Sequence, residues 1–437
     1  MRKIRENVLL TFTVKNFRSF REEQTLDLRA TKEKPAYSWL ESNVAKQDQG
    51  EPILKTKAIY GANASGKSNL IRAIFTWHTI AQDSATNHNL LSWVSPFVLD
   101  PRCRDYPTEL KAVFTFGGKT FEYALAIRNG VIEKEWLYNL TKRKALVFER
   151  IYQEVIVNKT IFKSDDRLSF LLDQESDLFN SNVSFFSAAN LLKINPLLLS
   201  IKQYFHSILI VPDDSFPEIE HTSLKVLAEQ FDIRAKTLNI LQEMDIDLAD
   251  LLVVDRDNKD YLDKNPSLEP FMVATDDKYI AISMRPLQDN TSDMMAWPSK
   301  TGESAGTNKL LHLVPAVVMI LEGSGTLLID EFESQLHTKL SREIVQLFNS
   351  KTGNPNNAQF IFSTHDTNLL DNKLLRRDQV ALVEKNERGA SEVYSLSDVK
   401  GVRKEDNFER DYLGGSYGAV PNVRELDIDL EAHPDGE

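Results

Sequence analysis

Apolar and polar residues alternate over two stretches near the N-terminus, and this pattern predicts a pair of β-strands. The stretches are VLLTFTVKNF, which begins at residue 8, and TLDLRA, which ends at residue 30. A charged turn at residues 18–24 separates them. Because a period of two places alternate side chains on a buried face, we expect an edge hairpin over residues 8–30.

Three further alternating runs predict an antiparallel meander between residues 109 and 138. They read LKAVFTF, TFEYALAI and VIEKEWLY, and the pairs Gly117-Gly118 and Asn129-Gly130 separate them. Both pairs are typical of the tight turns that join hairpin strands.

The pattern changes between residues 140 and 290, where polar and helical segments follow one another without a catalytic motif. Periodic apolar positions predict helices over residues 224–231 and 235–244. No heptad pattern persists for the roughly three or four repeats that a long coiled coil needs. We expect a mainly helical insertion that forms an arm, a partner-binding region or a sensor.

Buried-strand patterns return in the last part of the chain, at residues 326–329, 359–362 and 379–384. Together with a short apolar strand at residues 57–60, they predict an α/β sheet that the insertion splits. We therefore divide the chain into an N-terminal lobe (1–140), the insertion (141–290), a C-terminal lobe (291–422) and an acidic tail (423–437).

Composition narrows the class of protein. The 437 residues are 42% hydrophobic, which is enough for at least one large core. The single cysteine, Cys103, cannot form an internal disulfide, and we expect a reducing, cytoplasmic location. The longest apolar stretch, residues 310–321, is too short to cross a bilayer and contains His312 and Pro315, so we expect no membrane partner.

The formal net charge of -12 argues against broad, nonspecific binding to nucleic acid, since such binding depends on Lys and Arg displacing counterions. Local basic clusters at residues 142–144 and 376–377 leave a small basic groove open as a possibility. Solvated surface charge is the simpler interpretation of these clusters.

A glycine-rich motif, GANASGKS at residues 61–68, follows the strand at 57–60 and precedes an apolar-periodic helix. It fits the P-loop pattern in the required context. The glycines let the backbone curl so that its N–H groups surround phosphates, and the helix N-terminus adds partial positive charge. Lys67 would reach the terminal phosphates and Ser68 would ligate Mg²⁺. The predicted ATP-binding residues of this motif are Gly61, Ala62, Asn63, Ala64, Ser65, Gly66, Lys67, Ser68 and Asn69.

An apolar strand that ends in two acids, GTLLIDE, supplies the second candidate element. Asp330 can hold Mg²⁺ through water, and Glu331 can polarise the attacking water as a general base. Paired acids at a strand end can also be surface charge. The four apolar residues before them instead predict burial. The whole segment, strand and acids together, resembles a Walker B motif.

Two further motifs accompany these elements. Ser304 and Gly306, in ESAGT before a helical stretch, offer a hydroxyl and backbone N–H groups to a γ-phosphate presented by a second subunit. The alternative is an N-cap serine followed by a flexible glycine. His365, in QFIFSTHD, lies just beyond an apolar strand, where it can hydrogen-bond the γ-phosphate or have no special role.

These four motifs, in this order and with the opening VKNFRSF, resemble the RecF, SMC and OLD branch of ABC-type ATPases. The resemblance covers residues 1–140 and 290–422. It implies an α/β fold, an ABC-type P-loop ATPase head with an antiparallel β subdomain and a helical insertion. It also implies that Arg18 lies beside the nucleotide, and that a homodimer or higher oligomer sandwiches ATP between the P-loop of one copy and the signature of the other. Glu331, His365 and Lys67 would then be catalytic.

More narrowly, ESAGTNKLL, LLIDEFESQLH, FSTHDTNLLD, RRDQVALVEKN and YLGGSYGAVP resemble the ATPases of bacterial anti-phage modules, of the RloA type and the PARIS ATPase subunit type. This resemblance implies an ATP-gated switch or scaffold that controls a separately encoded effector, often a nuclease. The signature lacks the usual leucine and double glycine, which favours slow turnover.

Other functions make different predictions. A RecF- or SMC-like ATPase of DNA repair would show ATP-stimulated, salt-sensitive DNA binding. A transporter subunit would carry a fuller signature, and a nucleotide kinase would need neither signature nor histidine. A nuclease of the OLD kind would need a TOPRIM domain, but Asp427 and Asp429 lie in the terminal acidic tail, where no such fold fits.

Overall fold

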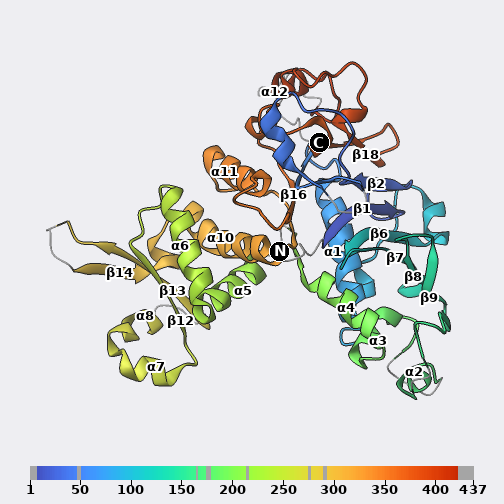
Figure 1. Ribbon diagram of the computed structural model, residues 1–437, viewed down its shortest axis with the longest axis horizontal. Helices are drawn as coiled ribbons and strands as arrows, with labels where there is room; N and C mark the ends of the chain where they lie inside the picture. Colours follow the sequence, from blue (N-terminus) through green and yellow to red (C-terminus); the bar gives the residue numbers. More distant parts are fainter. Residues whose placement is uncertain are drawn as a thin grey trace, which may run out of the picture.

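The computed structural model describes residues 7–46, 51–163, 166–173, 179–212, 216–273, 277–288 and 293–421. Within these ranges the chain is a mixed α/β protein built on two large sheets, with helix α1 (Lys67–Asp83) beside both (Figure 1). The α/β class predicted from the sequence is confirmed. The predicted acidic tail lies outside the described residues.

The first large sheet has seven strands in the order β10-β9-β8-β7-β6-β1-β2. All its neighbours pair antiparallel, which confirms the N-terminal hairpin with β2 at the edge, and the meander of β6, β7 and β8. Its strands are β1 (Val8–Lys15), β2 (Gln24–Asp27), β6 (Thr108–Phe116), β7 (Lys119–Arg128), β8 (Val131–Asn139), β9 (Ala145–Ile151) and β10 (Glu154–Val157).

The second large sheet has six strands in the order β11-β15-β16-β5-β17-β18. From β11 to β17 every neighbouring pair is parallel, and only β18 runs antiparallel. Its strands are β5 (Thr56–Tyr60), β11 (Ile208–Val211), β15 (Thr326–Ile329), β16 (Gln359–Ser363), β17 (Val380–Lys385) and β18 (Ser391–Ser395).

Burial on both faces explains why the parallel strands of the second sheet are mainly apolar. In β5, Ile59 faces a core shared with α1 and the seven-stranded sheet, whereas Ala58 and Tyr60 face a core shared with α10 (Ala305–Gly323) and α11 (Thr338–Asn349). The other parallel strands alternate in the same way. A strand covered on both faces has no polar side, which is the usual pattern of parallel sheets.

Helices and strands mix between residues 141 and 290. The two helices predicted there are present as α5 (Phe216–Glu229), which begins earlier than expected, and α6 (Phe231–Glu243). Strands β9 and β10 extend the meander and β11 joins the six-stranded sheet, which the sequence analysis did not anticipate. The four apolar residues of β11 come directly after Ser207, which ends the apolar helix α4 (Pro196–His206). Periodicity alone cannot distinguish a short buried strand from the continuation of such a helix. The boundaries of this insertion remain a prediction.

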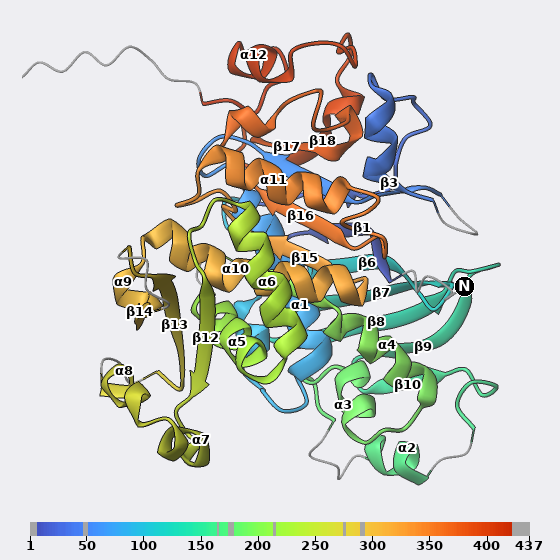
Figure 2. The same ribbon diagram turned by 60° about the vertical axis from the view of Figure 1, so that its left-hand side comes forward.

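A small antiparallel sheet, β12-β13-β14, lies with α7 and α8 away from the two large sheets (Figures 1 and 2). No helix in the described ranges is long and apolar enough to span a membrane. The remaining strands are β3 (Val44–Ala45), β4 (Ile53–Leu54), β12 (Asp250–Asp255), β13 (Tyr279–Pro286) and β14 (Met294–Pro298). The remaining helices are α2 (Asp166–Leu171), α3 (Phe185–Leu191), α4 (Pro196–His206), α7 (Lys259–Lys264), α8 (Glu269–Val273), α9 (Ser299–Gly302) and α12 (Phe408–Leu413).

Candidate nucleotide-binding site

The glycine-rich motif joins the carboxyl end of β5 to the N-terminus of α1. Gly66 precedes the helix with a φ of 121°, a conformation that L side chains rarely adopt. A Cβ on Gly61 would overlap the carbonyl oxygen of Val383 in the neighbouring strand β17. The sequence therefore needs glycine at both positions to fold the loop tightly against the sheet.

Lys67 lies inside this loop. Its Nζ donates hydrogen bonds to the carbonyl oxygens of Gly61, at 2.8 Å, and Ala62, at 3.1 Å. Burial lowers the pKa of Lys67, and the nearby negative charges of Asp330 and Glu331 partly oppose this shift. The lysine is thus held at the mouth of the loop and within the electrostatic reach of both acids.

The other residues of the motif differ in exposure. Asn63 and Ala64 are exposed at the tip of the loop, whereas Ser65 is buried. Ser68 and Asn69 lie half-buried in the first turn of α1. The loop therefore presents its tip and the first turn of the helix to a ligand.

Two serines that the sequence analysis missed hold the P-loop from outside. Ser391, the first residue of β18, donates to the carbonyl oxygen of Ser65 at 2.5 Å, and its backbone N–H donates to Ser19 at 2.8 Å. The Ser19 hydroxyl accepts a hydrogen bond from Asn69 at 2.9 Å. A serine in a polar turn carries no local signal of such a role, since the contacts join segments hundreds of residues apart.

Arg18 immediately precedes Ser19 in the same turn. It has a φ of 50°, and its guanidinium carbon lies 5.7 Å from the ring centre of Phe17. Its backbone N–H donates to Ser95 at 2.8 Å. The turn therefore touches the P-loop helix through Ser19, and a contact of Arg18 itself with nucleotide stays a prediction.

The two acids follow β15. Asp330 is only 6% exposed, and one of its carboxylate oxygens accepts a hydrogen bond from the hydroxyl of Ser363 on β16. The same hydroxyl accepts the backbone N–H of Glu331 at 2.9 Å. Glu331 is half-buried, with a φ of 46°. Ser363, another residue that the sequence analysis missed, therefore holds the carboxylate of Asp330 and the backbone of Glu331.

His365 lies two residues beyond the end of β16, and its side chain is exposed. Its backbone N–H donates to Oε1 of Glu333 at 2.6 Å. The loop after β16 is thereby tied to the loop after β15. Glu333 is a further residue of the site that the sequence motifs did not single out.

Strand order brings these groups together. Strand β16 lies between β15 and β5 and pairs parallel with both, so the carboxyl ends of all three strands meet at one edge of the sheet. The P-loop, the acid pair and His365 follow those ends. This is where ligands bind in open α/β sheets.

The donor set at this edge fits a nucleotide with Mg²⁺. The loop offers backbone N–H groups and a lysine to phosphates, while Ser68 and Asp330 offer oxygen atoms, which Mg²⁺ prefers. The described residues contain no group of three or more His, Cys, Asp or Glu that could hold a metal by themselves. A Mg²⁺ site of this type takes phosphate and water oxygens as further ligands and needs no such cluster.

The signature residues lie at the start of α10. The Ser304 hydroxyl accepts the N–H of Thr307 at 3.1 Å and thus caps the helix, as the alternative interpretation of this serine predicts. A Cβ on Gly306 would come within 2.7 Å of the carbonyl oxygen of Gln335, so the helix start packs closely on the loop after the acids. Among the described residues, no hydrogen bond joins Ser304 to the P-loop of the same chain. Ser304 is exposed and accessible to another molecule.

Comparison with known families adds an assignment. Residues 58–371, more than two thirds of the chain, match the family described as "AAA domain, putative AbiEii toxin, Type IV TA system". The chain belongs to this family. The matched range begins in β5 and contains the P-loop, the signature residues, the acid pair and His365, so the AAA-family region includes every motif of the candidate site except Arg18.

Solved structures of SMC heads are similar to the chain only remotely. The SMC head domain from Thermotoga maritima is 14% identical, with 89% of this chain and 98% of that one covered and a TM-score of 0.42. An SMC head bound to the C-terminal winged-helix domain of ScpA is also 14% identical, with 89% and 97% covered and a TM-score of 0.38. No curated protein matched the sequence. TM-scores of this size do not establish a common fold, and the fold described above rests on the strand order.

Proposed function

We propose that the chain is a slow ATPase that binds ATP with Mg²⁺ at the edge formed by β5, β16 and β15. The observation that carries this proposal is the convergence of the P-loop, the acid pair and His365 on three adjacent parallel strands. A single motif can arise by chance. Three motifs from distant parts of the sequence, placed at one sheet edge, have a common chemical purpose.

Each residue has a role that follows from its position. Backbone N–H groups of residues 61–66 and the ammonium of Lys67 bind the phosphates, and Ser68 with Asp330 holds Mg²⁺. Bound Mg²⁺ would neutralise the phosphate charge. Glu331 orients the attacking water and accepts its proton, and His365 hydrogen-bonds the terminal phosphate.

We further propose that two copies form the complete site. Ser304 and Gly306 lie at the N-terminus of a 19-residue helix, where N–H groups favour an anion. In this proposal they bind the terminal phosphate held by the P-loop of the partner copy. The exposure of Ser304 supports this arrangement.

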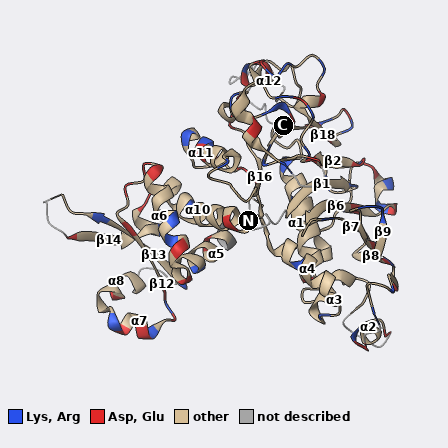
Figure 3. Cartoon of the chain, in the orientation of Figure 1, with Lys and Arg blue, Asp and Glu red and all other residues tan. Residues whose placement is uncertain are grey.

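At the cellular level we propose a cytoplasmic, ATP-gated switch of anti-phage defence that controls a separately encoded effector, for which a nuclease is the expected class. The description of the matched family, which refers to a toxin–antitoxin system, supports a role in a module of more than one gene. Acidic and basic residues are mixed over the ribbon rather than separated by sign (Figure 3).

Glu331→Gln tests the ATPase proposal. The amide keeps the size of the side chain but cannot accept a proton, so we expect phosphate release to fall about a hundredfold or more while ATP binding persists. Phosphate release and the affinity for a fluorescent ATP analogue would be measured together. An ATP-dependent increase in the molecular mass of this variant, from one copy to two or more, would support the composite site. Light scattering would measure it.

Unchanged hydrolysis by Glu331→Gln would remove Glu331 from the mechanism. No ATP binding by the wild-type protein would contradict the nucleotide site itself. ATP-stimulated and salt-sensitive DNA binding, without capture of any effector, would replace the effector proposal with the DNA-repair alternative.

A further inference from the structure

Four hydrogen bonds join the loop after β15 to the end of β16 and the loop that follows it. Ser363 contributes three of them: its hydroxyl donates to Asp330 and accepts from the N–H of Glu331, and its carbonyl accepts from the N–H of Phe332 at 3.2 Å. The fourth runs from the N–H of His365 to Oε1 of Glu333 at 2.6 Å. Three of these bonds therefore involve the last residue of β16, and the bond between His365 and Glu333 joins the two loops beyond the strands.

The two carboxylate oxygens of Glu333, which follows the acid pair by two residues, have different environments. Its Oε1 accepts the backbone of His365, and its Oε2 is buried without a hydrogen-bond partner among the residues that the structure describes. Burial lowers the pKa of Lys67 and raises that of Tyr60, and the charge of Glu333 opposes the first shift and adds to the second. The carboxylate therefore lies within electrostatic reach of both groups. Surface charge does not explain a carboxylate in this position.

The side chain of His365 is exposed, and other groups of its loop make the contacts that anchor it. Besides Glu333, Tyr60 donates its hydroxyl to the carbonyl of Asp366 at 3.1 Å, and Thr367 donates to Glu409 at 2.8 Å. Of these three contacts, only the one from Glu333 connects the histidine to the loop that bears the acids. Losing it would leave the acid pair joined to the end of β16 through Ser363, but would remove the direct contact at His365 itself.

We propose that Glu333 is a positioning residue that couples His365 to Glu331, so that contact of the histidine with a phosphate and alignment of the general base occur together. The proposal deepens the proposed ATPase function and rests on it. The hydrogen bond is short, at 2.6 Å, and hydrogen bonds are directional, which suits this role. Small displacements of an aligned catalytic group cost large factors in rate.

A matched pair of variants, Glu333→Gln and Glu333→Met, tests the coupling. Glutamine and methionine have similar volume and no charge, but only glutamine keeps an oxygen that can accept the N–H of His365. In the nucleotide-free protein we expect Glu333→Met to speed amide hydrogen exchange at His365 about tenfold or more, whereas Glu333→Gln stays close to wild type. In ATPase assays we expect the methionine variant to lose about tenfold or more in kcat with little change in KM, and the glutamine variant to keep most of its activity.

Equal loss in both variants would show that the charge of Glu333 is what matters, and would overturn the coupling. So would unchanged exchange and kcat in the methionine variant. Urea unfolding checks that each variant folds, and Glu333→Ala replaces Glu333→Met if the longer apolar side chain prevents folding. Because hydrogen exchange is measured without ATP, its result stands even if the wild-type protein proves inactive, which would instead contradict the proposed function.

Discussion

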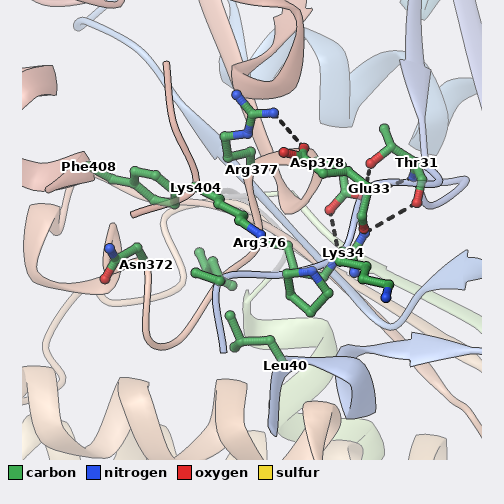
Figure 4. Close-up of a pocket in the computed structure, with 13 residues that line it drawn as sticks. Thr31, Glu33, Lys34, Leu40, Asn372, Arg376, Arg377, Asp378, Lys404 and Phe408 are labelled. Carbon is green, nitrogen blue, oxygen red and sulfur yellow. Dashed lines mark hydrogen bonds and ion pairs between the residues drawn. The ribbon is translucent and has the colours of Figure 1, made fainter. Parts of the chain in front are cut away.

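At the residue scale, burial of a charged side chain in the sheet that carries the candidate site is unfavourable, and Lys57 is the clearest case. Its side chain is 3% exposed in the middle of the six-stranded sheet, and its ammonium donates to the carbonyl oxygen of Asp378 at 2.6 Å. Asp378 is itself held by Arg376 and Thr31 in a compact polar cluster (Figure 4). The pocket beside this cluster has a volume of about 10 Å³, near the least that holds one water, so the cluster is a structural link between segments.

Burial lowers the pKa of Lys57 to about 8, from an ordinary value of 10.5. Between these two values the unfolded chain binds more protons at this residue than the folded chain does. The free energy of unfolding therefore rises with pH across that window, by an amount on the order of 3 kcal/mol from this residue. Below pH 8 the cost of the buried charge is present in full.

Replacing Lys57 by methionine removes this proton linkage. We expect the free energy of unfolding of Lys57→Met to rise less steeply than that of wild type between pH 8 and 10.5, because methionine does not titrate. Urea unfolding curves at several pH values would measure the difference. Lys55, whose pKa is also lowered to about 8, remains in both proteins and cancels in the comparison. Parallel pH profiles would show that Lys57 stays charged or is solvated.

At the scale of elements, the P-loop is shaped by its neighbours as much as by its own sequence. Strand β17 passes so close to Gly61 that the carbonyl of Val383 occupies the place of a Cβ. Gly66 meets Ser391 and Ser19 in the same way, at the start of α1. The strand, loop and helix therefore form one rigid unit, in which a glycine stands wherever another backbone or side chain approaches closely.

Gly61→Ala tests this rigidity. The added methyl group must displace β17 or the loop, so we expect a loss of about 1–3 kcal/mol in stability together with much weaker ATP binding. Gly323→Ala is the matched control, since Gly323 ends α10 and a Cβ there meets no atom within 4 Å. This control should be neutral or slightly more stable. Thermal unfolding and nucleotide titration would be measured for both, and equal behaviour would contradict the close approach.

At the scale of the whole molecule, the sheet edge that carries the candidate nucleotide site lies between two structurally different parts. The antiparallel sheet with α1 lies on one side, and α10, α5 and α6 with the small sheet lie on the other (Figures 1 and 2). The P-loop belongs to the first side, at the start of α1, and the signature residues belong to the second, at the start of α10. In the proposed composite site, each P-loop would therefore meet the signature residues of a second copy of the chain.

Mixing two inactive variants tests the composite site directly. Lys67→Ala removes the phosphate-binding lysine, and Ser304→Arg blocks the signature, so we expect each alone to be inactive. A mixed dimer would hold one site made only of wild-type parts, and an equal mixture should recover up to about a quarter of wild-type phosphate release. Thermal unfolding of Ser304→Arg is the control, since the helix loses a cap worth about 1 kcal/mol. No recovery, with both variants folded and exchanging subunits, would contradict a site shared between copies.

The candidate site shows how far sequence patterns reach. The strand patterns around Asp330 and His365 are short, apolar and close to their motifs, so local sequence was enough to place each motif at a strand end. Ser19, Ser363, Glu333 and Ser391 were missed because their roles arise from contacts between segments far apart in the chain. Polar residues in turns look alike until the fold shows which atoms they meet.

By itself, the sequence determined the α/β class, the N-terminal hairpin, the meander and the P-loop between a strand and a helix. These features depend on local periodicity and turn chemistry, which act over a few residues. Only the tertiary structure decided that β11 joins the core sheet and that β16 lies between the strands of the P-loop and the acids. Only the tertiary structure likewise decided that Glu333 reaches the backbone of His365. Strand order and long-range hydrogen bonds depend on how distant segments pack, and no local pattern encodes that packing.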